Sequence, residues 1–195
     1  AQMVAFDRPV TESGTINVEL KERIGRAASE LISKGETVML DAGSTTYQVV
    51  KHLRATNVTL VTNSFDAAAV AMSKPDTDVL MVGGIVRAHG RATVGPTAED
   101  QIALFKADTA ILGMNGVSPE DGLTTPNILV AQVKRAMVAQ SKRLILVADH
   151  TKLGVSALCK VGAMEDAEVL VTDGEADPEV LSAIRDRGVD VVIAR

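Results

Sequence analysis

Short apolar runs that alternate with amphipathic segments constrain the fold of this chain more than any other feature. The run Leu144–Ala148 has no polar side chain, whereas Ile128–Ser141 gathers its apolar residues on one helical side. Continuous apolar runs are typical of parallel strands that helices cover on both faces. Such runs lie at 37–40, 58–62, 78–82, 109–112, 144–148, 168–172 and 190–194. We therefore predict an α/β fold: a mostly parallel sheet of six or seven strands with helices on both faces.

The segments between these runs predict the helices. Turn residues between two short β-like runs at 85–95 indicate a hairpin or an excursion from the sheet. Residues 1–18 have no clear periodicity. Helices are expected at about 19–33, 44–53, 67–72, 98–104, 128–141 and from Pro178 onward.

The stretch from Asp41 to Thr46 reads as a turn between a buried strand and a helix. Gly43 permits a tight turn, and Ser44, Thr45 and Thr46 open the helix. The first N–H groups of a helix have no intrahelical partner and lie at the positive end of its dipole, which favours a bound phosphate. A plain N-cap explains the stretch equally well, although a cap needs only one hydroxyl. Both interpretations stay open on this stretch alone.

Small and polar residues also follow the other predicted strands. Ligands of open α/β sheets bind at the carboxyl ends of the strands, and cations lie near these ends at Arg87, Lys134 and Lys152. Hydroxyls, glycines, amides and carboxylates together fit a small phosphorylated carbohydrate better than a nucleotide. The residues concerned are Asp41–Thr46, Thr62–Ser64, Gly83–Gly84, Gly113–Gly116, Asp149–Lys152 and Thr172–Asp173.

Composition and missing motifs exclude several function classes. The 195 residues have a net charge of −5 and only 2% aromatic residues, so nucleic-acid binding by this chain alone is not expected. The single Cys159 excludes an internal disulfide, and neither a membrane span nor a signal peptide is visible. No dinucleotide, P-loop or hydrolase motif occurs, and the histidines lack metal-ligand spacing. We expect a cytoplasmic protein without cofactor or metal.

Together, these motifs resemble the DeoR family of bacterial transcriptional repressors. The similarity runs in order through residues 20–175, and two blocks are distinctive in combination, D-x-G-[ST]-T at Asp41 and A-D-[HS]-[ST]-K-[FL]-G at Ala148. It implies the C-terminal effector-sensing domain, with a fold similar to ribose-5-phosphate isomerase and glucosamine-6-phosphate deaminase. Members of the family carry an N-terminal winged helix-turn-helix that binds operator DNA, and a phosphorylated sugar relieves repression of a catabolic operon.

The resemblance also implies the organisation of the chain. Residues 1–20 would be a lead-in segment that follows an N-terminal DNA-binding domain absent from this chain, and residues 21–195 the effector-sensing domain. The partners implied are a phosphorylated sugar or polyol, operator DNA through the absent domain, and further copies in a dimer or tetramer, with no membrane. The implied role is that of a sensor rather than an enzyme.

The family pattern, transferred residue by residue, implies the effector site. The phosphate loop corresponds to Gly43, Ser44, Thr45 and Thr46, and Asp41 and Asn63 line the pocket. The remaining effector-binding residues implied are Gly83, Gly84, Arg87, Asn115, Gly116, Lys134, Asp149 and Lys152. Many relatives have a glutamate shortly before the helix lysine, where this chain has Val130. We therefore expect this departure to affect either the recognition of sugar hydroxyls by the pocket or the pairing of subunits.

Two other functions remain open on the sequence. One is a sugar-phosphate isomerase or deaminase, in which Asp41 or Asp149 would act as base and Lys152 as electrophile. The other is an assembly domain with a vestigial pocket. Fold alone does not decide among these functions.

Overall fold

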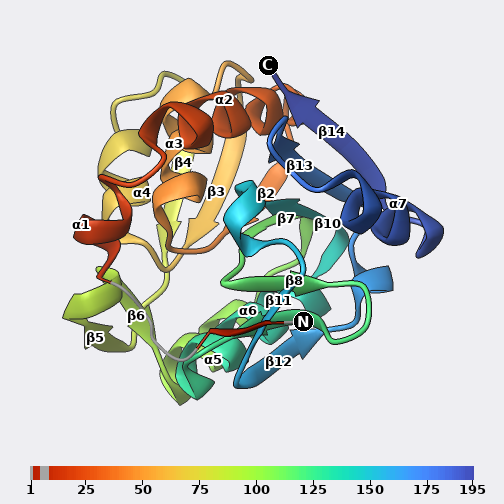
Figure 1. Ribbon diagram of the computed structural model, residues 1–195. Helices are drawn as coiled ribbons and strands as arrows, with labels where there is room; N and C mark the ends of the chain where they lie inside the picture. The colour runs from red at the N-terminus through yellow and green to blue at the C-terminus, as the bar shows by residue number, and fades with distance from the viewer. Residues whose placement is uncertain (1, 5–8) are drawn as a thin grey trace.

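The computed structural model describes residues 2–4 and 9–195, and a seven-stranded sheet forms its centre (Figure 1). All neighbouring strands of this sheet are parallel, in the order β14-β13-β10-β7-β2-β3-β4. The predicted α/β fold is thereby confirmed. The strands are β2 (Thr37–Leu40), β3 (Val58–Thr62), β4 (Thr77–Met81), β7 (Ala107–Gly113), β10 (Ser141–Val147), β13 (Val169–Asp173) and β14 (Asp190–Ala194).

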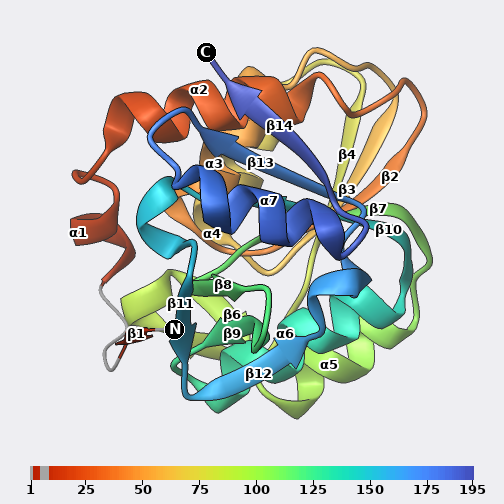
Figure 2. The ribbon, with the colours of Figure 1, turned by 45° about the vertical axis from the view of Figure 1, so that its right-hand side comes forward.

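Helices cover both faces of the sheet (Figures 1 and 2). Successive strand residues point to opposite faces, so Ile111 of β7 packs into one core and Leu112 into the other. Among the described residues, no helix is long and apolar enough to cross a bilayer. The Ile111 face is covered by α2 (Val18–Ser29), α3 (Ser44–His52) and α4 (Phe65–Ala71), and the Leu112 face by α5 (Pro96–Ala103), α6 (Ile128–Ala139) and α7 (Pro178–Asp186).

Small sheets extend this framework. The predicted hairpin at 85–95 is present as antiparallel β5 (Ile85–Arg87) and β6 (Ala92–Val94). Two short strands lie between the predicted strand at 109–112 and the predicted helix at 128–141. They are β8 (Gly116–Ser118) and β9 (Gly122–Thr125), and with β12 (Cys159–Gly162) they form an antiparallel sheet. Strands of three or four residues that contain glycine are too short for a periodic signal, which is why the pattern missed them.

The lead-in segment also has structure. β1 (Gln2–Val4) pairs in parallel with β11 (Val155–Ala157), and α1 (Val10–Ser13) is a single helical turn. Residues 1 and 5–8 of the predicted lead-in lie outside the described residues. The pairing of β1 with β11 joins the N-terminal segment to residues that lie far from it in the sequence.

The strand order changes direction between β2 and β7. From β2 the chain continues outward to β3 and β4, and from β7 it continues to the opposite edge through β10, β13 and β14. In open α/β sheets such a reversal leaves a crevice at the carboxyl ends of the two strands. Helix α3 begins beside this crevice, and three residues separate it from the end of β2.

The opposite, amino ends of the central strands are joined through Asp108. Its carboxylate accepts hydrogen bonds from Lys142 Nζ at 2.7 Å and from the Thr37 backbone N–H at 3.0 Å. These two donors, Lys142 first, lower the pKa of the Asp108 carboxyl below its ordinary value. One side chain of β7 therefore contacts both neighbouring strands, β2 and β10, at the end of the sheet remote from the crevice.

Helices α2 and α3 approach so closely at Gly25 that no side chain fits there. A Cβ on Gly25 would overlap Gln48 Cβ and lie 2.6 Å from the Gln48 carbonyl carbon. We expect Gly25→Ala to lower the free energy of unfolding by about 1–3 kcal/mol, although alanine is the better helix former by about 1 kcal/mol. Urea unfolding followed by circular dichroism measures the change.

The control is Arg23→Ala on the exposed side of the same helix, where the expected change is within about 0.5 kcal/mol. A midpoint for Gly25→Ala that is unchanged or higher would contradict this close packing of α2 on α3.

Candidate functional site

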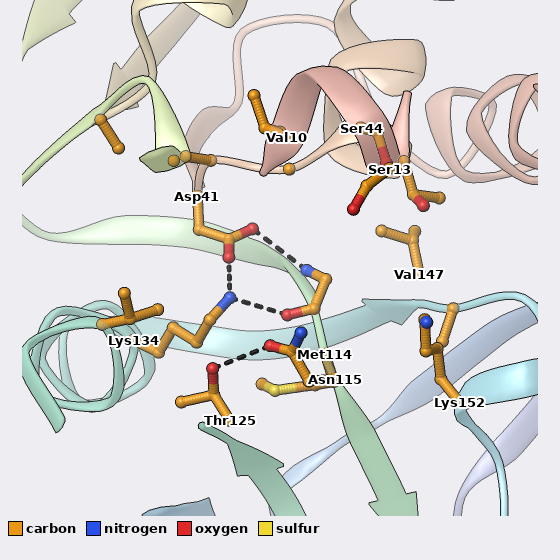
Figure 3. Close-up of a pocket in the computed structure, with 18 of the residues that line it drawn as sticks. Val10, Ser13, Asp41, Ser44, Met114, Asn115, Thr125, Lys134, Val147 and Lys152 are labelled. Carbon is orange, nitrogen blue, oxygen red and sulfur yellow. Dashed lines mark hydrogen bonds and ion pairs between the residues drawn. The ribbon is translucent and has the colours of Figure 1, made fainter. Parts of the chain in front are cut away.

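A cavity of about 430 Å³ opens at the carboxyl ends of the strands beside this crevice (Figure 3). Its volume falls within the range of about 300–1,000 Å³ typical of small-molecule sites. The strand ends contribute Asp41 after β2, Asn63 after β3, Gly113 at the end of β7 and Asp149 after β10. The first turn of α3, helix α6, the β5–β6 hairpin and residues between 10 and 21 complete the wall.

A buried ion pair connects three elements at the base of the cavity. Asp41 Oδ2 pairs with Lys134 Nζ of α6, and Asp41 Oδ1 accepts a hydrogen bond from the Gly113 N–H at 3.0 Å. Lys134 Nζ also donates to the Gly113 carbonyl at 2.7 Å, which closes a ring of three residues (Figure 3). Asp41 is 2% and Lys134 4% exposed. The ring therefore fixes β2, β7 and α6 relative to one another.

The first turn of α3 faces the cavity without a side-chain cap. Its N-cap is Gly43, which has no side chain to accept from the first N–H groups, and the turn has no acidic residue. Ser44 and Thr45 line the cavity. The Thr46 hydroxyl turns inward instead, toward the carbonyl oxygens of Asp41 at 2.9 Å and Gly43 at 3.0 Å. The positive end of this helix is therefore open to a ligand.

The charged side chains around the cavity are mostly basic, although the chain as a whole has a net charge of −5. Asp41 is neutralised by Lys134, and Asp149 accepts hydrogen bonds from the N–H and the hydroxyl of Thr151. The cavity thus has an excess of two positive charges, which favours an anionic ligand. The basic residues are Lys21, Arg87, Lys134 and Lys152, and the acidic ones are Asp41 and Asp149.

The opposite wall of the cavity is mixed in character. Val130 and Val133 of α6 and Met114 after β7 present apolar surface. Asn115 contributes an amide whose oxygen accepts from the Thr125 hydroxyl at 2.8 Å, and this bond fixes the orientation of the amide. Val130 therefore makes part of this wall apolar.

Ten of the fourteen site residues expected from the sequence lie on the cavity wall, and the structure brings these ten together from six separate segments. They are Asp41, Gly43, Ser44, Thr45, Asn63, Arg87, Asn115, Lys134, Asp149 and Lys152.

The other four expected residues are not on the cavity wall. Thr46 is fully buried under the turn, and the Gly83 N–H donates to Gln101 Oε1 at 2.7 Å. Gly84 has a φ of 141°, a conformation that favours glycine. At Gly116 a Cβ would lie 2.6 Å from the Val155 carbonyl oxygen, so only glycine fits between the strands.

Several wall residues were not expected from the sequence. Val10, Ser13 and Ile16 come from the segment without periodicity, and Lys21 from the start of α2. Lys21 belongs to the sequence similarity noted above, but nothing in its spacing indicated a pocket. Thr151 bonds to Asp149 two residues away, as turn-forming residues do, whereas Thr125 of β9 bonds to Asn115 from ten positions further along the chain.

The sequence of this chain matches a known protein family and is similar to individual regulators. Residues 16–174 match the family model described as the DeoR C terminal sensor domain. The chain is 34% identical over 176 residues to the HTH-type transcriptional regulator GlpR of Haloferax volcanii, covering 90% of this chain and 69% of that protein. It is 30% identical over 187 residues to the glycerol-3-phosphate regulon repressor of Escherichia coli, covering 95% and 72%.

Solved structures share the fold at low sequence identity. A transcriptional regulator from Streptococcus pneumoniae aligns with a TM-score of 0.52 and 13% identity, over 96% of this chain and 90% of that one. A D-ribose-5-phosphate isomerase in complex with phospho-erythronic acid aligns with a TM-score of 0.52 and 18% identity, over 72% and 54%. These two likenesses confirm the expected fold relationship and carry no further conclusion about activity.

The ring of Asp41, Lys134 and Gly113 leads to a prediction for stability. Either Asp41→Asn or Lys134→Met leaves the other charge buried without its partner, which costs about 3–5 kcal/mol. The double variant removes both charges, so we expect it to be more stable than the sum of the single losses implies. A double-mutant cycle from urea unfolding measures this coupling. Additive losses would contradict a direct pairing of the two side chains.

Proposed function

This chain belongs to the family of DeoR C-terminal sensor domains, and from this membership we infer that its cavity binds a small phosphorylated sugar or polyol. The resemblance noted in the sequence is confirmed by the family match and by relatives named as transcriptional regulators and repressors. The chain is therefore a sensor domain of the kind found in DeoR-type repressors. The identity of its ligand and the residues that bind it are our proposal.

The observation that carries this proposal is the open first turn of α3. Gly43 cannot cap the helix, and the first turn has no carboxylate that would compete with a bound anion. A phosphate seated there would accept from backbone N–H groups and from the hydroxyls of Ser44 and Thr45, as phosphates do at other helix N-termini. Lys152, on the same cavity, would add a charge-assisted contact.

The remaining wall suits the carbon skeleton of the ligand. Asn63, Asn115 and Arg87 offer polar groups to hydroxyls, whereas Val130 and Val133 suit the C–H side of a small carbon chain. A cavity of about 430 Å³ limits the ligand to small-molecule size.

Binding would act on transcription through a separate domain. We propose that operator DNA is bound by an N-terminal helix-turn-helix domain outside residues 1–195, and that the sensor works in the cytoplasm as a dimer or tetramer. Relatives such as the glycerol-3-phosphate regulon repressor are named as repressors. A typical coupling of about 1–3 kcal/mol between effector and operator sites would change operator affinity by roughly 5–150-fold.

We propose binding without turnover, against the alternative of an isomerase or deaminase. Both oxygens of Asp41 are engaged, one by Lys134 and one by the Gly113 N–H, so Asp41 is poorly placed to accept a proton. Asp149 is 2% exposed and accepts from Thr151. Incubation with ribose 5-phosphate should therefore give no ribulose 5-phosphate, and enzyme-like turnover would overturn this part of the proposal.

A carboxylate placed in the first turn of α3 should abolish phosphate binding without unfolding the helix. Two like charges about 4 Å apart repel by about 4 kcal/mol at an effective dielectric constant of about 20, so we expect Ser44→Glu to weaken binding more than a hundredfold. An acidic side chain at a helix N-terminus is itself stabilising. Isothermal titration with glycerol 3-phosphate, 4-phosphoerythronate and inorganic phosphate measures the effect.

The matched control is Thr97→Glu, which places the same carboxylate in the exposed first turn of α5, off the cavity. We expect it to leave each affinity unchanged. Equal binding by Ser44→Glu and the wild type would show that the phosphate sits elsewhere.

A further inference from the structure

Lys21 is a buried cation on the cavity wall that also holds the segment in front of it. It is 6% exposed, and its Nζ donates to the Ser13 carbonyl oxygen at 2.5 Å. Ser13 is the last residue of α1, so the lysine lies at the negative end of that helical turn. The same ammonium therefore contacts both the cavity and the carboxyl end of α1.

The held segment, residues 9–17, forms part of the cavity wall and is called the strap below. It contributes Val10, Ser13 and Ile16 to the lining. Its only helix has four residues, none of them buried, and no side-chain N-cap hydrogen bond. One isolated helical turn is unstable in water, so the position of the strap depends on its tertiary contacts. Lys21 supplies one of them.

The strap lies beside the open end of α3. Helix α1 contacts α3, and Ser13 and Ser44 are drawn close together in Figure 3, with Lys152 below them in that view. An anion at the first turn of α3 would therefore lie near the strap, in the cavity that Lys152 also lines. An ammonium group has three donors, which allows Lys21 to keep the Ser13 carbonyl while it donates to such an anion.

We propose that Lys21 is a ligand-binding residue that couples phosphate binding to closure of the strap. This inference rests on the proposed function of the cavity. A bound phosphate gives Lys21 and Ser13 a common partner, so the closed strap binds the ligand more tightly than the open strap does. By linkage, the ligand raises the population of the closed strap by the same factor.

The strap lies on the N-terminal side of the sensor domain, where a preceding domain would be attached. The family match begins at residue 16, so most of the strap precedes the matched sensor domain. The strap leads directly into α2, which packs on α3. A DNA-binding domain attached before residue 1 would be connected to the cavity through the strap. Closure of the strap would then transmit ligand binding to that domain.

Hydrogen exchange read by mass spectrometry tests the coupling on the full 195-residue chain. With inorganic phosphate or glycerol 3-phosphate at saturation, we expect the amides of residues 10–17 to exchange about tenfold more slowly in the wild type. In Lys21→Met the same amides should exchange faster without ligand and gain no protection from it. Isothermal titration should show about tenfold weaker binding of both probes to this variant, the loss of one charge-assisted hydrogen bond.

Lys51→Met is the matched control, because Lys51 is an exposed lysine of α3 that pairs only loosely with Glu22, at 3.5 Å. It should behave as the wild type does. The wild-type result decides the inference even if Lys21→Met is poorly folded. Unchanged exchange at 10–17 while a probe is bound would overturn strap closure and leave the proposed function intact. No binding of either probe to the wild type would overturn both.

Discussion

The ion pair between Asp41 and Lys134 is the interaction on which the cavity depends. It joins the end of β2 to α6 and, through the Gly113 N–H and carbonyl, to the end of β7. These strands are the two at which the sheet order reverses, where the polypeptide itself leaves a crevice. A buried pair of this kind adds little net stability, but removing one partner is costly. Its contribution is to hold the three walls in one arrangement.

That arrangement separates structural from binding roles among neighbouring polar residues. The Thr46 hydroxyl is directed into the protein, where it holds the turn, and both carboxylate oxygens of Asp41 are engaged, by Lys134 and by the Gly113 N–H. Gly43, Ser44 and Thr45 are left at the cavity, with the positive end of α3 unoccupied by any acidic side chain. In a chain of net charge −5, a cavity rich in basic residues is a local exception. Such an exception is what recognition of a small anion requires.

Much of the fold could be predicted from the sequence, because buried parallel strands carry a strong local signal. The apolar run at Leu144–Ala148 and the turn at Asp41–Thr46 each indicated the element that is present there. The short strands β8 and β9 and the single turn α1 could not be predicted, since three or four residues show no periodicity. The two resemblance blocks indicated the pocket but could not separate wall residues such as Ser44 from supporting ones such as Thr46.

The site is completed by contacts between residues far apart in the sequence, and local sequence patterns could not predict these contacts. Asp41 and Lys134 lie 93 positions apart, and only the folded chain brings them together. Lys21 belongs to the sequence similarity, but nothing in its spacing predicts that it is buried on the cavity wall. Its neighbours in the cavity come from β2, β7, β10 and α6, so its role depends on tertiary packing.

The central claim is that a phosphate binds at the first turn of α3. Two-dimensional ¹H–¹⁵N spectra of the chain, titrated with glycerol 3-phosphate and with inorganic phosphate, test it most directly. We expect both ligands to shift the amide signals of Ser44, Thr45 and Thr46 most strongly, because those N–H groups would donate to the phosphate. Binding that leaves these three amides unshifted and moves signals elsewhere would contradict it.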